Sequence, residues 1–210
     1  LYDAFDTPES KSIVIANDIT IDRTILLKAS FDSSAGIHRP VSLTSRNSSR
    51  LFVSESVGTL FKLESGTIRH LSIVDLIVDG TSATVSDDFI TLESGASMIR
   101  CHISGVDMRG FNILGDIIKT NGTGSVSWSH IDRCHFGNID ADCLGVTIVE
   151  NIVANDLTFQ TDSTWNAISA NHFSGGGDIN TSAGEYNTIV GNTNTGTITT
   201  GTGDQSGLNT

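Results

Sequence analysis

The chain has 210 residues, with 12 basic against 24 acidic side chains and a formal net charge of −12. Such a surface repels the phosphates of a nucleic acid, so we expect no nucleic-acid partner. No apolar run approaches the roughly 20 residues that a membrane-spanning helix needs, so we expect no membrane insertion. The length suits one domain or one continuous solenoid.

Short apolar segments separated by polar turns occupy the first third of the chain. Residues 1–12 are polar, contain Pro8 and predict an arm that leads into the fold or links it to an upstream segment. Ser, Gly and Pro in residues 29–40 predict a loop. The apolar segments on either side of it predict short strands at residues 13–15, 19–21, 25–27, 41–43, 51–53 and 60–63.

An eight-residue segment that begins at Ile73 recurs in degenerate form along the rest of the chain. Its copies occupy residues 98–105, 131–138, 152–159, 168–175 and 189–196. A short unit that recurs every 16 to 33 residues, with a mostly apolar sixth position and a mostly glycine eighth, is typical of a solenoid. The alternation of its side chains predicts strands rather than helices, with three strands and three turns in each coil.

The fourth position of these copies predicts a ladder of inward side chains. In chain order it holds Leu76, Cys101, Cys134, Asn155, Asn171 and Asn192. Stacked strands lie about 4.8 Å apart, so equivalent residues of successive coils come into contact. Asn suits such a column because it tolerates left-handed backbone and can bond to the Asn above and below it. The two cysteines would lie in adjacent coils, either as a disulfide or, as the pattern favours, as reduced thiols.

These columns resemble those of the single-stranded right-handed parallel β-helix, the architecture of pectate lyases and phage tailspikes, over roughly residues 13–196. The resemblance implies an all-β solenoid and says little about activity, because one fold serves many functions. The coils shorten towards the C-terminus, and residues 197–210 are rich in Gly and Thr, with almost nothing to bury. We expect this last segment to be a disordered tail or an intersubunit segment, and the short coils to be stabilised in a homotrimer.

Carbohydrate cleavage on such a solenoid requires two or three carboxylates that converge on one groove. If the chain is an enzyme, Asp75, Asp79 and Asp107 are the first candidates. No segment matches the paired aspartates and Gly-His-Gly of polygalacturonases or the calcium and arginine signature of pectate lyases. The sequence therefore assigns no catalytic residue.

Candidates for ligand binding lie in two predicted loops, residues 81–88 and 106–116, which should cluster on one side of the solenoid. These loops carry Asp87, Asp88 and Arg109. Trp128 is a further candidate, because an exposed indole suits sugar stacking, although the pattern equally allows it a place in the core.

Three histidines share the fifth position of the repeat, which should face outwards. They are His102, His135 and His172. Imidazoles in neighbouring coils can bind a metal, but their spacing along the chain is irregular, and exposed strand positions often hold histidine for no such reason. The sequence therefore assigns no metal and no cofactor.

The sequence leaves three hypotheses about function. The first is a structural or adhesive component of a virus particle, a phage tail or capsid appendage, that contacts other virion proteins and cell-surface polysaccharide. It would lie at the virion surface or outside the cell. The second is a polysaccharide lyase or glycoside hydrolase with a groove along the solenoid, and the third is a bacterial secreted β-helix adhesin.

Overall fold

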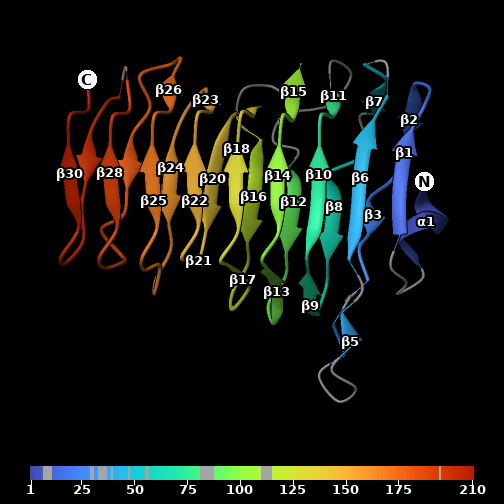
Figure 1. Ribbon diagram of the computed structural model, residues 1–210, viewed down its shortest axis with the longest axis horizontal. Helices are drawn as coiled ribbons and strands as arrows, with labels where there is room; N and C mark the ends of the chain where they lie inside the picture. Colours follow the sequence, from blue (N-terminus) through green and yellow to red (C-terminus); the bar gives the residue numbers. More distant parts are fainter. Residues whose placement is uncertain are drawn as a thin grey trace.

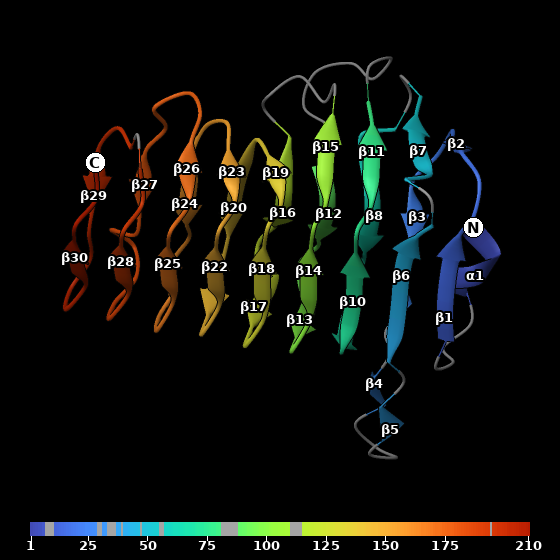
Figure 2. The same cartoon turned by 45° about the horizontal axis from the view of Figure 1, so that its top comes forward.

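The computed structural model describes residues 1–6, 11–28, 31–32, 37–38, 40–46, 48–54, 57–80, 88–109, 115–193 and 195–210. Within them the regular structure is almost entirely short strands, which form four parallel sheets and one antiparallel hairpin. Figures 1 and 2 show the coils side by side along one axis, from the N-terminus at one end to the C-terminus at the other. The expected all-β solenoid of parallel strands is therefore confirmed.

Each of the four parallel sheets is built from strands of successive coils, in chain order. The first sheet holds β1 (Lys11–Ile15), β6 (Val41–Ser45), β10 (Leu71–Val74), β14 (His102–Ser104), β18 (His130–Asp132), β22 (Thr147–Val149), β25 (Ala167–Ser169), β28 (Thr188–Val190) and β30 (Gln205–Gly207). The second holds β2 (Ile19–Ile21), β7 (Arg50–Val53), β11 (Ile77–Asp79), β15 (Asp107–Arg109), β19 (His135–Phe136), β23 (Ile152–Val153) and β26 (His172–Phe173). The third holds β3 (Ile25–Leu26), β8 (Thr59–Leu63), β12 (Asp88–Leu92), β16 (Asp116–Thr120), β20 (Asn138–Ala141), β24 (Leu157–Phe159), β27 (Ile179–Asn180) and β29 (Ile198–Thr199). The fourth holds β9 (Gly66–Arg69), β13 (Ala96–Ile99), β17 (Ser125–Ser127) and β21 (Cys143–Leu144).

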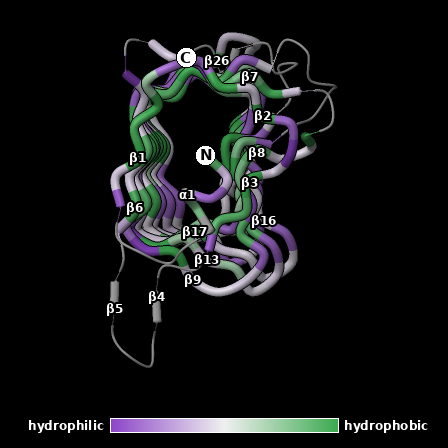
Figure 3. Tube along the Cα trace, turned by 90° about the vertical axis from the view of Figure 1, so that its right-hand side faces the viewer, coloured by the Kyte–Doolittle hydropathy of each residue, from purple (hydrophilic) through white to green (hydrophobic). Residues whose placement is uncertain are grey.

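A full coil contains four strands, one from each sheet, rather than the three expected. The coil that begins with β10 continues through β11, β12 and β13 before β14 pairs with β10. Later coils are shorter, and in them the fourth strand is reduced to an isolated bridge at Thr164. Figure 3, a view along the axis, shows the coils superposed in one closed outline. Strands β4 (Phe31–Asp32) and β5 (Ile37–His38) pair as an antiparallel hairpin beside the solenoid (Figure 2).

The interior of the coils is an apolar core that extends from Phe5 to Ile189. Ile73, Ile103 and Ile131 pair in successive coils of the first sheet and are buried, as are the equivalent isoleucines of the next three coils. At the N-terminal end, helix α1 (Tyr2–Asp6) places Phe5 against Phe61, with ring centroids 5.5 Å apart. The predicted leading arm thus contributes Phe5 to the core. Burial of one phenylalanine stabilises a fold by about 1.5–3 kcal/mol. In the described part of the chain, no helix has the length and apolarity that a membrane crossing requires.

A buried asparagine ladder follows the first sheet, at the corner that leads to the second. The backbone N–H of Asn151 donates to Oδ1 of Asn171 (3.0 Å), and the N–H of Asn171 donates to Oδ1 of Asn192 (3.0 Å). The Asn171 amide also donates to the carbonyl oxygen of Ile148 (3.0 Å). At the bend, backbone N–H and C=O groups have no partner in the sheets. The asparagine amides bond to these groups, so they are not left buried without a hydrogen bond.

The predicted ladder is correct at three of its polar positions and wrong at two. Cys134, Asn171 and Asn192 lie in this column, but its fourth member is Asn151, and Asn155 lies outside it, half-buried in the turn between β23 and β24. Cys101 belongs to a second ladder at the opposite corner of the first sheet, where its N–H donates to Oγ of Ser129 (3.0 Å). The two positions were predicted wrongly because the coil length changes along the chain. Between paired residues of the first sheet it is 28 residues from Ile103 to Ile131 but 17 from Ile131 to Ile148.

The C-terminal segment continues the solenoid instead of leaving it. Strands β29 and β30 pair with β27 and β28 of the same chain, so residues 197–210 are not a separate tail in this structure. Polar ladders replace apolar burial there, since Asp204 accepts from the backbone N–H of Asn187 (2.7 Å) and from the Thr181 hydroxyl (2.6 Å). These bonds link successive coils in a segment that has few apolar residues to bury.

Candidate functional site

Two corners of the coil, one at each end of the first sheet, hold residues in the left-handed backbone region. The corner before the first sheet contains His70, Arg100, Trp128, Gly145, Trp165, Tyr186 and Gly203, with φ between +51° and +72°. The strand pairings place these residues in one column along the solenoid. The residue after each of them is buried in the second ladder, which is apolar at Leu71 and Val146 and polar further along, as at Asn166 after Trp165. A left-handed residue followed by an inward polar one turns its own side chain to the outside of the corner.

This corner presents an exposed aromatic column. Trp128, Trp165 and Tyr186 are 59%, 63% and 50% exposed, although aromatic side chains of this size are usually largely buried. The rings of Trp165 and Tyr186 stack at 5.2 Å between centroids and 23° between planes. A methyl group built on Gly145 would lie 2.5 Å from Cε3 of Trp128, so the Trp128 indole covers the backbone of that glycine. The column is therefore ordered by its own contacts while its outer edges face solvent.

Polar and acidic groups surround the aromatic column. Asp162 and Glu185 are exposed beside it, and Glu185 is paired with Thr164 of the coil before. Residues 106–210, which carry the three aromatic side chains, hold 3 basic and 11 acidic side chains. Such a surface can bind an uncharged ligand that offers both apolar faces and hydroxyl groups, and it repels anionic ones.

A pair of carboxylates lies at the start of two neighbouring strands of the third sheet. Asp88 opens β12 and Asp116 opens β16, and the N–H of Asp116 donates to Oδ1 of Asp88 (3.3 Å). Lys119 lies 3.6 Å from Asp88 Oδ2 and 3.7 Å from Asp116 Oδ2. Burial, and then the negative charge of Asp88, raise the pKa of Asp116 to about 7. Burial also raises the pKa of Asp88, against the opposing pull of Lys119. Near neutral pH, Asp116 can therefore hold or release a proton, as a general acid must.

The three carboxylates proposed for an enzyme lie at the corner after the first sheet and on two paired strands of the second sheet. Asp75 lies at the left-handed corner after the first sheet and is exposed. Asp79 pairs with Arg50 (3.5 Å), and Asp107 lies 3.6 Å from Nδ1 of His135, at the edge of a shallow hollow. Asp79 and Asp107 thus have different ion-pair partners, Arg50 and His135.

The predicted ligand-binding residues have different outcomes. Trp128 is exposed and begins the aromatic column, whereas Asp88 is buried beside Asp116. Arg109 ends strand β15, and Asp87 lies outside the described residues. Trp165 and Tyr186 were not predicted from the sequence, although each directly precedes a ladder asparagine, which is the signal that identifies a corner position.

Two cysteines were candidates for a disulfide, and three histidines were candidates for a metal site. Cys101, Cys134 and Cys143 are buried free thiols, and Cys101 and Cys134 belong to different corners, which excludes the adjacent stacking that a disulfide between them requires. His135 and His172 lie in the second sheet, with Asp107 and Thr193 as their neighbours. His102 lies in the first sheet, paired with His130.

Comparison with protein-family models, with curated proteins and with solved structures finds no match to this chain. The function must therefore be argued from the side chains that the solenoid presents.

Proposed function

We propose that the protein is a structural and adhesive component of a virus particle, such as a phage tail or capsid appendage, that contacts neutral cell-surface polysaccharide. In this proposal it is a right-handed parallel β-helix that assembles as a homotrimer with other virion proteins and lies at the virion surface. The regular solenoid supports the mechanical part, because continuous parallel sheets and buried amide ladders make a stiff rod. The viral and trimeric parts derive from the resemblance of the repeat to tailspike solenoids.

The aromatic column is the observation that carries the adhesive part. Three large rings project from one corner. Exposure of clustered apolar surface to water is unfavourable, so such a cluster indicates a binding surface. The apolar faces of a neutral sugar can pack on such rings, while the sugar hydroxyls bond to neighbours such as Glu185 and Thr164. Coils repeat about every 4.8 Å, so a column that spans several coils suits an extended polymer better than a single monosaccharide.

The test is whether the chain binds neutral polysaccharides. Binding is measured by calorimetry and by quenching of tryptophan fluorescence. Trp165→Gly introduces a residue that the chain itself uses at this corner, at Gly145 and Gly203, so the backbone can keep its conformation. We expect this variant to lose at least about tenfold in affinity, or about 1.4 kcal/mol. Tyr186→Phe keeps the ring and should bind as the unaltered chain does.

The matched control is Leu208→Ala, which removes an exposed apolar side chain at the other left-handed corner. Equal binding by Trp165→Gly and Leu208→Ala would overturn the glycan contact. The trimer is tested separately by light scattering, where a mass of three times 22.2 kDa is expected. A stable monomer would refute that part and leave the glycan contact standing.

A second candidate function is polysaccharide cleavage, favoured by the Asp88 and Asp116 pair. Two carboxylates beside a lysine, one of them with a pKa raised to about 7, supply the proton donor that glycoside cleavage needs. Incubation of the chain with the polysaccharides that it binds should then release oligosaccharides, and Asp116→Asn should abolish the release with binding intact. Absence of products from every bound polysaccharide would exclude this candidate.

A further inference from the structure

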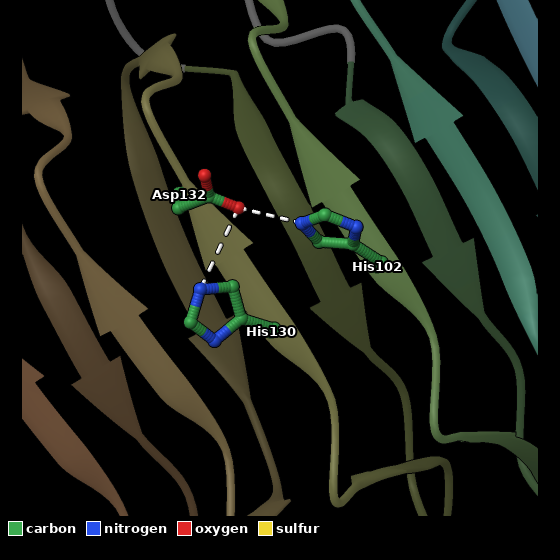
Figure 4. Close-up of side chains that lie close together, drawn as sticks. All are labelled: His102, His130 and Asp132. Atoms are coloured by element: carbon green, nitrogen blue, oxygen red, sulfur yellow. Dashed lines mark hydrogen bonds and ion pairs between the residues drawn. The ribbon is translucent and has the colours of Figure 1, made fainter.

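The outer face of the first sheet carries a second group of side chains, independent of the aromatic column. His102 on β14 and His130 on β18 are directly paired across the two strands, and their ring centroids lie 5.5 Å apart. Asp132 follows His130 by two residues, so its side chain leaves the strand on the same face. Figure 4 shows one carboxylate oxygen of Asp132 facing both imidazoles. In the part of the chain that the structure describes, this is the one group of three metal-type ligands.

We propose that His102, His130 and Asp132 bind one divalent transition-metal ion, with Zn²⁺ as the ion that best matches their chemistry. Imidazole nitrogen and carboxylate oxygen are both common zinc ligands. One potential ligand atom from each side chain lies within 4.8 Å of the other two. Three protein ligands leave one tetrahedral position for water or for an oxygen of a bound molecule.

The two distances from the Asp132 carboxylate to the histidines suit a metal after small side-chain adjustments. Bonds of about 2.0 Å at tetrahedral angles place neighbouring ligand atoms about 3.3 Å apart. Nε2 of His130 lies 3.6 Å from Oδ1 of Asp132, close to that separation. Nε2 of His102 lies 2.7 Å from the same oxygen and must move away by about 0.6 Å to admit the ion. Both imidazole side chains are more than 40% exposed, so they have room for that movement.

A second layer of hydrogen bonds orients the carboxylate. Oδ2 of Asp132 accepts from Oγ of Ser104 (3.0 Å) and from Nε of Arg133 (2.8 Å), and Arg133 also donates to Ser104 (2.6 Å). These bonds occupy one carboxylate oxygen and direct the other, Oδ1, towards the histidines. Such supporting contacts are typical of metal sites, where they fix the ligand and tune its basicity. A histidine that merely covers the sheet surface would not need an aspartate held in this way.

The metal would also join two successive coils. His102 comes from one coil, and His130 and Asp132 come from the next. An ion bound to both coils stabilises the folded chain by linkage, because the unfolded chain does not hold the three ligands together. We therefore expect Zn²⁺ to raise the unfolding temperature of the protein.

The test is calorimetric titration of the full chain, prepared without a histidine tag and freed of metal with a chelator, with Zn²⁺ alone. One Zn²⁺ per chain and a higher unfolding temperature are expected, and Co²⁺ in its place should give the absorption bands of a tetrahedral site. His102→Ala and His130→Gln should each weaken Zn²⁺ binding at least about tenfold, because each removes one of three ligands. Both side chains are on the surface, so both variants should fold, which circular dichroism checks.

His172→Ala is the matched control, since His172 is another exposed strand histidine, outside the cluster. It should bind Zn²⁺ as the unaltered chain does. Ser104→Ala should weaken binding by about 10- to 100-fold through loss of the support for Asp132. Absence of saturable Zn²⁺ binding, or binding unaffected by His102→Ala, would overturn the proposal.

Discussion

Replacement of Asp116 by Asn should make the protein more stable at alkaline pH and should change its stability much less at acid pH. In the folded chain, burial and the neighbouring Asp88 raise the pKa of Asp116 to about 7, from 3.8 for a free side chain. At a pH between these two pKa values, Asp116 keeps its proton in the folded state and has released it in the unfolded state. This group therefore favours folding at low pH, and that contribution is lost as the pH rises from about 4 through 7. An asparagine cannot ionise, so it avoids the loss.

The size of the effect follows from the shift. A difference of 3.2 between the two pKa values corresponds to at most about 4 kcal/mol, at 1.36 kcal/mol for each pKa unit. The attraction of Lys119, 3.7 Å away, is already included in this pKa, whereas relaxation and water penetration around the ionised carboxylate reduce the realised effect. We expect a net gain of about 2 kcal/mol at pH 8.5, or about 4–8 °C in Tm for a chain of this length.

The assay is thermal unfolding of both chains at pH 5 and at pH 8.5, followed by circular dichroism. The informative quantity is the difference in Tm between variant and parent at each pH, since carboxylates away from Asp116 and Asp88 contribute equally to both chains. Asp162→Asn is the control, because Asp162 is exposed at a turn with φ +70°, which asparagine tolerates. A variant that gains as much at pH 5 as at pH 8.5 would refute the assigned cause.

Three further outcomes follow from the interior of the solenoid. Asn171→Ala leaves buried backbone groups without partners and should cost about 3–5 kcal/mol in urea unfolding, whereas Asn155→Ala, outside the ladder, should cost less than half as much. Gly177→Ala should prevent normal folding, because the added methyl carbon would lie 1.6 Å from the Asn155 carbonyl oxygen, while Gly58→Ala meets nothing within 4 Å and should change Tm little. Cys143 should not react with iodoacetamide at pH 8 until the chain unfolds, because burial raises its thiol pKa and blocks access. Rapid labelling of Cys143 in the folded chain would contradict its place in the packed core.

The architecture was predictable because it depends on short-range patterns. Alternation of apolar and polar residues predicted strands, and the return of Ile73 as Ile131, Ile168 and Ile189 predicted a solenoid with one sheet along it. These patterns survive variation in coil length, since they require only that each coil place one apolar residue inwards. For the same reason they contain no information on handedness or on the number of subunits.

The register was only partly predictable, because a local match can outweigh the correct one. Residues 152–155 read Ile-Val-Ala-Asn and match Ile-Ser-Ala-Asn at 168–171 more closely than the true equivalent, Ile-Val-Glu-Asn at 148–151, does. Only the latter pairs in the first sheet, and its Asn151 is buried whereas Asn155 is partly exposed. The length of each turn decides between them, and turn length depends on the whole coil. A register error of the same kind aligned residues 98–105 with residues 131–138. It placed His102 in a column with His135, whereas His102 pairs with His130.

The corners show how one backbone requirement determines both the inside and the outside of this solenoid. A tight bend removes a backbone N–H from the sheets, so a small polar side chain must turn inwards to accept from it, as Asn187 does. The residue before it must adopt left-handed backbone and therefore points outwards, as Tyr186 does. Asparagine and glycine are the residues that tolerate left-handed backbone most readily, and glycine does occupy this column at Gly145 and Gly203. Tryptophan at Trp165 instead accepts the strain of a positive φ, so what favours it there is the exposed surface of its indole rather than the bend.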